Sequence, residues 1–185
     1  MRRVRYFVAN SLDNFIARKD GAVDWLFTKG DYGMREFFAS VDTMLMGRKT
    51  YEIALILSNG QKQKKRKGKR TFCSSMKNYV FSRTIKEAPD EDVAIISDDA
   101  AGFVRNLKAE AGKDIWLMGG GELARSLFAE NLVDEISLNI HPVLLGSGIP
   151  LFPDIGAQID LELTDCKAHP NGCVQVAYRV KGDEG

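Results

Sequence analysis

Two short segments carry residue types that could bind phosphate, MGRKT at residues 46–50 and MGGGE at residues 118–122. In each, a β-rich run ends in glycine and a helix-forming run follows directly. The free N–H groups of a helix N-terminus bind anions, and glycine lets a phosphate approach the backbone closely. Arg48 and Lys49 add two positive charges that suit a dinucleotide with an additional 2′-phosphate. The pattern predicts a two-sided cofactor site, with a solvated Arg-Lys pair and a tight strand-to-helix turn as the plainer alternatives.

The sequence GGGELA at 119–124 also fits the loose dinucleotide-binding pattern G-x-G-x-x-A of the Rossmann fold. That fold needs further βαβ units after the motif. Here the motif comes late, and the segments after it have the pattern of antiparallel strands. We therefore interpret the glycines as one side of a different kind of cofactor site.

A third segment, LNIHPVLLGSGIPLF at 138–152, ends a strand at His141-Pro142 and continues into a glycine-containing loop at 146–150. This loop could form one wall of a substrate pocket, or it could be a structural crossover between strands. A lone histidine on a strand is more often packed or at the surface than a proton donor, so packing is the favoured interpretation of His141.

The elements that position these segments alternate between strand and helix patterns. Apolar residues at helical spacing, such as Met34, Phe37 and Phe38, predict a helix at 32–41. The predicted strands are 5–9, 43–46, 78–82, 93–97, 115–118, 133–140, 158–168 and 173–180, and the predicted helices are 32–41, a segment beginning near 48, 100–111 and 122–130. The last two strands form a hairpin turned by HPNG at 169–172. This order predicts an α/β fold in one domain over residues 1–185, with a mixed, mostly parallel sheet flanked by helices and an antiparallel C-terminal hairpin.

The composition is that of one globular domain, because 44% of the 185 residues are hydrophobic and 28% are charged. The first residues read as a strand and not as a signal peptide, and no apolar run approaches the roughly 20 residues that span a bilayer. We therefore expect a cytoplasmic protein without membrane contact. Three cysteines without metal-ligand spacing predict reduced thiols and no metal site.

The net charge of +1 gives the chain no general attraction to nucleic acid. The exception is the basic segment QKQKKRKGKR at 61–70, which includes Lys62 and Arg70. Such a block of like charges is typical of a solvated surface loop, and contact with a polyanion or a cofactor phosphate is the alternative. It has no interleaved aromatic residues on which bases could stack, so we expect no nucleic-acid partner.

Taken in order, five motifs of the chain resemble a known family. They are VANSLDNFIA, MGRKTYE, VFSRT, IWLMGGGELARSLF and VDEISLNIHPVLLGSGIPLF, and the resemblance runs from Val4 to about Val180. The chain resembles the dihydrofolate-reductase-like superfamily, and within it the C-terminal reductase domain of the bifunctional riboflavin-biosynthesis deaminase-reductase. The resemblance implies a three-layer fold and an NADPH-dependent reductase. The implied activity is similar to that of 5-amino-6-(5-phosphoribosylamino)uracil reductase, or of a relative that reduces a pyrimidine-like or pterin-like small molecule.

The resemblance also implies which residues bind NADPH. The backbones of Ala9 and Ile16 would contact the nicotinamide carboxamide, and Ser82 with Arg83 would contact the 2′-phosphate. The pyrophosphate and adenosine would lie between two sets of residues, Gly47, Arg48, Lys49 and Thr50 on one side, and Gly119, Gly120, Gly121 and Glu122 on the other. The resemblance further implies a cis peptide between Gly119 and Gly120.

The proton source is open in the sequence. Asp31 lies at a spacing comparable to that of the carboxylate in folate reductases, but it could equally cap the helix that follows it. Glu36 lies farther along that helix. Asp13 is a candidate for substrate contact, with capping of a turn as the alternative. Asn14 stands where the family usually has glycine, and asparagine tolerates the left-handed backbone that such a turn needs.

The substrate is less defined than the cofactor. The chain lacks the H-x-E and P-C-x-x-C zinc signature of a deaminase. A non-catalytic NADPH-binding or sensor protein is the alternative function. We expect a homodimer, since the edges of the long C-terminal strands need cover.

Overall fold

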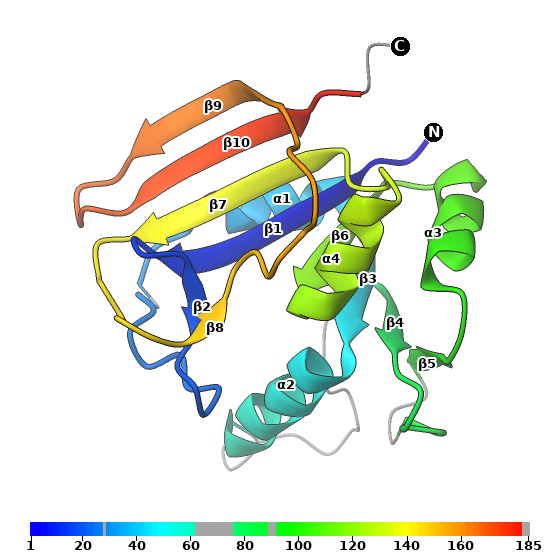
Figure 1. Cartoon of the computed structure of the whole chain (residues 1–185). Helices are drawn as coiled ribbons and strands as arrows, with labels where there is room; N and C mark the ends of the chain where they lie inside the picture. The colour runs from blue at the N-terminus through cyan, green and yellow to red at the C-terminus, as the bar shows by residue number, and fades with distance from the viewer. Residues whose placement is uncertain (28, 62–75, 89–91, 183–185) are drawn as a thin grey trace.

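The computed structural model describes residues 1–27, 29–61, 76–88 and 92–182 (Figure 1). Its centre is an eight-stranded sheet in the order β5-β4-β3-β6-β1-β7-β10-β9. The strands of this sheet are β1 (Val4–Ser11), β3 (Val41–Gly47), β4 (Lys77–Phe81), β5 (Val93–Ile96), β6 (Asp114–Gly119), β7 (Glu135–His141), β9 (Leu161–Ala168) and β10 (Val174–Val180). A small second sheet pairs β2 (Phe15–Ala17) with β8 (Ile149–Pro150). The basic segment at 61–70 lies almost wholly outside the described residues, as does Cys73.

Six strands run parallel, β10 runs antiparallel to its neighbour β7, and β9 at the edge runs antiparallel to β10. The expected mixed sheet and the C-terminal hairpin are therefore confirmed. In register, Met46 of β3 lies opposite Gly119 of β6, and Ser11 of β1 lies opposite His141 of β7. The carboxyl ends of these strands consequently meet at one edge of the sheet, where ligands bind in open α/β folds.

Helices cover both faces of the sheet, which gives the expected three layers (Figure 1). They are α1 (Met34–Ser40), α2 (Arg48–Gln61), α3 (Ala100–Ala109) and α4 (Gly121–Ala129). Successive residues of a strand point to opposite faces. On β1, Tyr6 accordingly joins the core that contains α3 and α4, whereas Phe7 stacks on Phe37 of α1 in a second core.

The element boundaries differ from the predicted ones by a few residues. Helix α1 begins at Met34, because Gly33 is its N-cap, and α4 begins at Gly121. Helix α3 ends at Ala109, two residues before the predicted end at residue 111. Cys166 and Cys173 are free thiols. No helix in the described part of the chain is long and apolar enough to cross a membrane.

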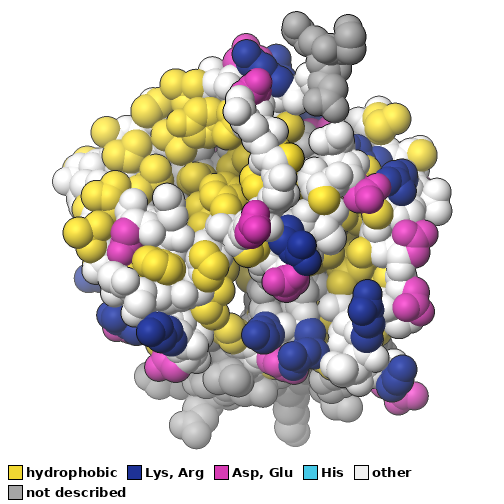
Figure 2. All heavy atoms as spheres, viewed as in Figure 1, with side chains coloured by type: hydrophobic (Ala, Val, Ile, Leu, Met, Phe, Trp, Pro, Cys, Tyr) yellow, Lys and Arg dark blue, Asp and Glu magenta, His cyan; other side chains and the backbone are white. Residues whose placement is uncertain are grey.

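One face of the last strands is apolar and has no helix over it. The register places Leu161 and Leu163 of β9 beside Val180 and Tyr178 of β10. Leu163 is 55% exposed, and every residue of β9 is exposed. Figure 2 shows the resulting hydrophobic surface over β7, β10 and β9.

Asp134, just before β7, binds residues near both ends of the chain. The N–H of Val4 donates to Asp134 Oδ2 (2.7 Å), and the N–H of Val180 donates to the Asp134 carbonyl (3.0 Å). Lys108, which is 7% exposed, pairs with the same carboxylate at 2.7 Å. These bonds hold the start of β1 and the end of β10 on either side of the start of β7, at the amino edge of the parallel strands.

Candidate functional site

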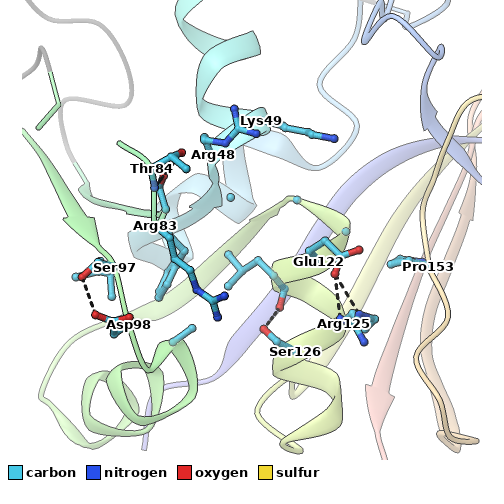
Figure 3. Close-up of a pocket in the computed structure, with 18 of the residues that line it drawn as sticks. Arg48, Lys49, Arg83, Thr84, Ser97, Asp98, Glu122, Arg125, Ser126 and Pro153 are labelled. Carbon is cyan, nitrogen blue, oxygen red and sulfur yellow. Dashed lines mark hydrogen bonds and ion pairs between the residues drawn. The ribbon is translucent and has the colours of Figure 1, made fainter. Parts of the chain in front are cut away.

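A cavity of about 750 Å³ opens at the carboxyl edge of the sheet (Figure 3). The ends of β3, β4, β5 and β6 and the first turns of α2, α3 and α4 form it. The lining residues are Gly47, Arg48, Lys49, Phe81, Ser82, Arg83, Thr84, Ile96, Ser97, Asp98, Asp99, Ala100, Gly120, Gly121, Glu122, Leu123, Arg125, Ser126, Ile149, Pro150 and Pro153. Most of the residues predicted to bind the cofactor are therefore brought to one cavity.

The two glycine turns lie against each other at the base of this cavity. A Cβ added to Gly120 would lie 3.0 Å from Gly47 Cα, and one added to Gly47 would lie 3.3 Å from Gly120 Cα. Gly120 also has a φ of +100°, which favours glycine. A side chain at either position would press on the backbone of the other turn, so the close approach of the two turns favours glycine at both. Thr50 lies beside Gly120, because that added Cβ would be 3.5 Å from Thr50 Oγ1.

The peptide between Gly119 and Gly120 is not cis, so this prediction was wrong. The φ values of the two glycines are +145° and +100°. These left-handed conformations, which side chains disfavour, turn the backbone from β6 into α4. The turn is thereby formed with a trans peptide.

The cationic residues of the cavity are held only by weak surface contacts. Arg48 pairs with Glu52 at 2.8 Å, but both side chains are about two-fifths exposed, at 40% and 46%. Such a pair contributes about 0.3–0.5 kcal/mol, so a ligand phosphate can compete for Arg48. Arg83 makes no ion pair within the described residues, and its guanidinium extends into the cavity between α3 and α4 (Figure 3). Lys49 is exposed at the same mouth.

Ser82 has a different part in the site from Arg83. Its hydroxyl accepts the N–H groups of Thr84 (3.2 Å) and Ile85 (2.9 Å), and the residue is buried. Ser82 therefore shapes the turn after β4 that carries Arg83 into the cavity.

Several lining residues were missed by the sequence reasoning. Ser97 and Asp98 follow β5, and they reach the cavity because β5 pairs with β4. Arg125 extends from α4 and pairs with Glu122 at 3.0 Å, three residues earlier. Its helical spacing from Glu122 was the available signal, because residues at i and i+3 share one face of a helix.

Comparison with known proteins settles the family. The sequence model of the RibD C-terminal domain family matches residues 2–175. The chain belongs to the RibD C-terminal domain family. It is 38% identical to the Bacillus subtilis (strain 168) protein YyaP over 182 residues, which cover 98% of this chain and 96% of YyaP. It is 36% identical to YwjB of the same organism over 170 residues, with 90% and 91% covered.

Solved structures agree with this family membership. A provisionally named riboflavin biosynthesis protein from Shewanella sp. PV-4 matches with a TM-score of 0.82 and 26% identity, covering 98% of this chain and 100% of that chain. A diaminohydroxyphosphoribosylaminopyrimidine deaminase/5-amino-6-(5-phosphoribosylamino)uracil reductase from Thermotoga maritima matches with a TM-score of 0.72 and 17% identity. The latter match covers 97% of this chain and 57% of that one, and it shows the fold alone.

The first loop of this RibD C-terminal domain lies beside the cavity. Ala9 and Ile16 do not line the cavity, but β2, which contains Ile16, pairs with β8, and Pro150 of β8 does line it. Asn14 has a φ of +63°, the left-handed conformation expected for its place in the turn. Its carbonyl accepts the N–H of Leu151 (2.9 Å), which ties the loop to the cavity wall.

Asp13 anchors the loop that follows β7. Its carboxylate accepts the Ser11 hydroxyl (2.6 Å) and the N–H groups of Leu145 (3.1 Å) and Gly146 (2.7 Å). The bond from Ser11, followed by those backbone bonds, lowers the pKa of Asp13 below its usual value. An ionised carboxylate with these partners is suited to holding loops together, which favours the turn-capping alternative over proton donation.

Asp31 lies at the start of α1. Its Oδ1 accepts the N–H of Arg35 (3.1 Å), and its carbonyl accepts the N–H of Met34 (2.8 Å). The side chain is exposed, as is Glu36 in the next turn. This geometry favours the capping alternative for Asp31 and places Glu36 in solvent.

Proposed function

We propose that this chain is an NADPH-dependent reductase of a small molecule, similar in activity to 5-amino-6-(5-phosphoribosylamino)uracil reductase or to a relative that acts on a pyrimidine-like or pterin-like substrate. One observation carries the proposal: the paired Gly47 and Gly120 turns face the same cavity as Arg48, Lys49 and Arg83. Family membership supports the reductase class. A cavity of about 750 Å³ lies within the usual range for a cofactor site.

The residues present fit a phosphorylated dinucleotide. The helix starts at Arg48 and Gly121 offer N–H groups to a pyrophosphate, and Gly47 and Gly120 leave room for it. Arg83 is placed to pair with a 2′-phosphate, because its guanidinium lies in the cavity without an ion partner in the described chain. When bound, NADPH supplies a hydride. The chain's part is to hold the dinucleotide along the carboxyl edge, from β4 toward β1.

The cofactor assignment is tested by the double variant Arg48→Ala/Arg83→Ala. Charge-assisted hydrogen bonds contribute about 1.5–3 kcal/mol each, so the loss of one is a factor of about 10–100 in affinity. We expect the Kd for NADPH to rise at least that much and the Kd for NADH to rise less than about threefold. Arg105→Ala is the matched control, because Arg105 pairs with Glu130 outside the cavity. Equal losses for NADPH and NADH would remove the 2′-phosphate assignment.

Turnover is tested separately from binding. The purified protein is incubated with NADPH and a panel of pyrimidines, pterins and aldehydes, and loss of the reduced nicotinamide absorbance is followed. Oxidation with one class supports the reductase. Tight NADPH binding without turnover on any of them supports the sensor alternative, and no NADPH binding contradicts both.

We also propose that the chain forms a homodimer through the helix-free face of β7, β10 and β9. This face exposes Leu161 and Leu163, at 38% and 55%, beside Tyr178 and Val180, and monomers rarely expose large apolar patches. A second copy offers a face of the same chemistry. Leu163→Lys should lower the mass in sedimentation velocity from twice 20.6 kDa to 20.6 kDa. A wild-type chain that sediments at 20.6 kDa would exclude the dimer.

A further inference from the structure

The cavity contains an acidic side chain that phosphate binding does not explain. Asp98 lies two residues beyond the end of β5 and lines the cavity, and Arg83 lies two residues beyond the end of β4 and lines it too. The last registered pair of these parallel strands is Phe81 with Ile96, so the two charged residues follow neighbouring strand ends at the same distance along the chain. Adjacent strands are about 4.8 Å apart, which brings an anion and a cation to one part of the cavity.

These opposite charges do not pair with each other. Arg83 makes no ion pair among the described residues, and Asp98 there accepts only the hydroxyl of Ser97, at 3.2 Å and through Oδ2. Both charged side chains are exposed, and Figure 3 shows no interaction between them. Asp98 Oδ1 is therefore available to a ligand. A ligand that satisfies both residues has an anionic group for Arg83 and, on a separate atom, a hydrogen-bond donor for Asp98.

Asp99, the next residue, serves the fold instead. Its Oδ1 accepts the N–H of Gly102 at 2.9 Å, and this bond caps the start of α3. Asp98 makes no such capping bond within the described residues. On this wall of the cavity, Asp98 is thus the acidic side chain that is free to contact a ligand.

The floor beside the two charged residues is apolar. Phe81 and Ile96 are register partners, so their side chains lie on the same face of the sheet. Ala100 of α3 and Leu123 of α4 line the cavity on either side of this face. Apolar walls with a few polar groups at their edge are typical of sites that bind a planar ring, and the polar groups fix the orientation of the ring.

The adenosine end of NADPH offers Asp98 two hydrogen-bond donors. They are the N6 amino group of adenine and the 3′-hydroxyl of the ribose, because the 2′-oxygen carries the phosphate. The 3′-hydroxyl lies between the 2′-phosphate and the pyrophosphate arm, so a carboxylate there would face two anions. The N6 amino group projects from the far side of the ring, away from both. The carboxylate of Asp98 therefore fits the N6 amino group better.

We propose that Asp98 determines the base specificity of the cofactor site, because its carboxylate accepts the N6 amino group of adenine while Arg83 holds the 2′-phosphate. This inference rests on the proposed NADPH function and adds to it a residue that contacts no phosphate. It implies selection against a hypoxanthine base, which has a carbonyl oxygen in place of the amino group. That oxygen would face the Asp98 carboxylate, and two acceptors cannot bond to each other.

The test compares NADPH with its hypoxanthine analogue by isothermal titration calorimetry on the full chain. The readout is the ratio of the two Kd values, because removing a negative charge changes the affinity for both phosphorylated dinucleotides alike. The wild-type chain should bind NADPH at least about tenfold more tightly, since the analogue leaves the carboxylate unpaired. Asp98→Ala should reduce this preference to less than about twofold. Asp98→Asn, whose amide can also donate, should bind the analogue at least as tightly as NADPH.

Asp154→Asn is the matched control. It makes the same change at a carboxylate that accepts the N–H of Gly156 outside the cavity, and it should keep the wild-type ratio. Asp98 is exposed and caps no helix, so both of its variants should unfold at the wild-type temperature. If one of them does not fold, the wild-type ratio and the other variant still decide.

The outcomes separate this inference from the cofactor proposal. Equal affinity of the wild-type chain for NADPH and the analogue, with NADPH binding still dependent on Arg83, would overturn the role of Asp98 alone. An unchanged ratio in both Asp98 variants would do the same. Stronger binding of NADPH relative to NADH in Asp98→Asn, with the base preference retained, would place the carboxylate at the ribose and also overturn the assignment. A wild-type chain that binds neither dinucleotide would contradict the cofactor proposal, and this inference with it.

Discussion

Replacing Gly120 with alanine tests the contact between the two glycine turns. The new Cβ would lie 3.0 Å from Gly47 Cα and 3.1 Å from Gly47 N, both backbone atoms that cannot rotate away. Overpacking of this kind costs about 1–3 kcal/mol. The backbone of Gly120, at φ +100° and ψ 98°, adds a further cost of about 1–3 kcal/mol for a residue with a side chain. We expect Gly120→Ala to lower the free energy of unfolding by about 2–6 kcal/mol.

Gly146→Ala is the matched control for this substitution. Gly146 also has a positive φ, +70°, but an added Cβ there would meet nothing within 4 Å. It should therefore show only the left-handed backbone cost of about 1–2 kcal/mol. Urea denaturation of both variants gives the two free energies, and the difference between them reports the Gly47 contact. Equal losses in the two variants would refute the close packing of the turns.

Three further perturbations test the supporting structure. Asn14 has a left-handed backbone with a φ of +63°. Asn14→Gly should therefore leave the free energy of unfolding nearly unchanged, and Asn14→Ala should lower it by about 1 kcal/mol, as measured by thermal unfolding. An alanine variant as stable as the glycine variant would contradict this. Lys108→Met should cost about 2–3 kcal/mol in urea denaturation, because it leaves the Asp134 carboxylate without its buried partner, and adding Asp134→Asn should recover part of that loss. The lowered pKa of Asp13 means that its stabilising contribution is complete above about pH 4, the unfolded value, and is lost as the pH falls through the folded value. Asp13→Asn should therefore flatten the acid side of the stability profile, and an unchanged profile would exclude the anchoring role.

The fold was predictable because its signals are local. The helical spacing around Phe37 predicted α1, and the HPNG turn predicted the β9–β10 hairpin. The glycine turns were likewise visible as strand-to-helix junctions at Gly47 and Gly120. The boundaries were less accurate, since the chain at 31–33 adopts left-handed backbone at Tyr32 and Gly33 before α1 begins, and spacing alone does not reveal such a start.

The parts of the site that the sequence did not predict depend on contacts between distant segments. Ser97 and Asp98 line the cavity only because β5 pairs with β4, a choice of neighbour that no local pattern specifies. Asp13 finds its partners at Leu145 and Gly146, more than 130 residues away in sequence. The predicted cis peptide came from family resemblance and was wrong, since the glycine φ values already turn the chain.

The bonds that Asp134 makes to Val4 and Val180 bear on circular permutation of the chain. Because these bonds hold the start of β1 and the end of β10 one strand apart, on either side of β7, a short linker could join the two ends of the domain. New ends could then be opened at an exposed turn such as that at Gly156, where an added Cβ meets nothing within 4 Å. The fold is thus suited to circular permutation, and to insertion as a cassette into a host protein, with both junctions at the edge of the sheet farthest from the cavity.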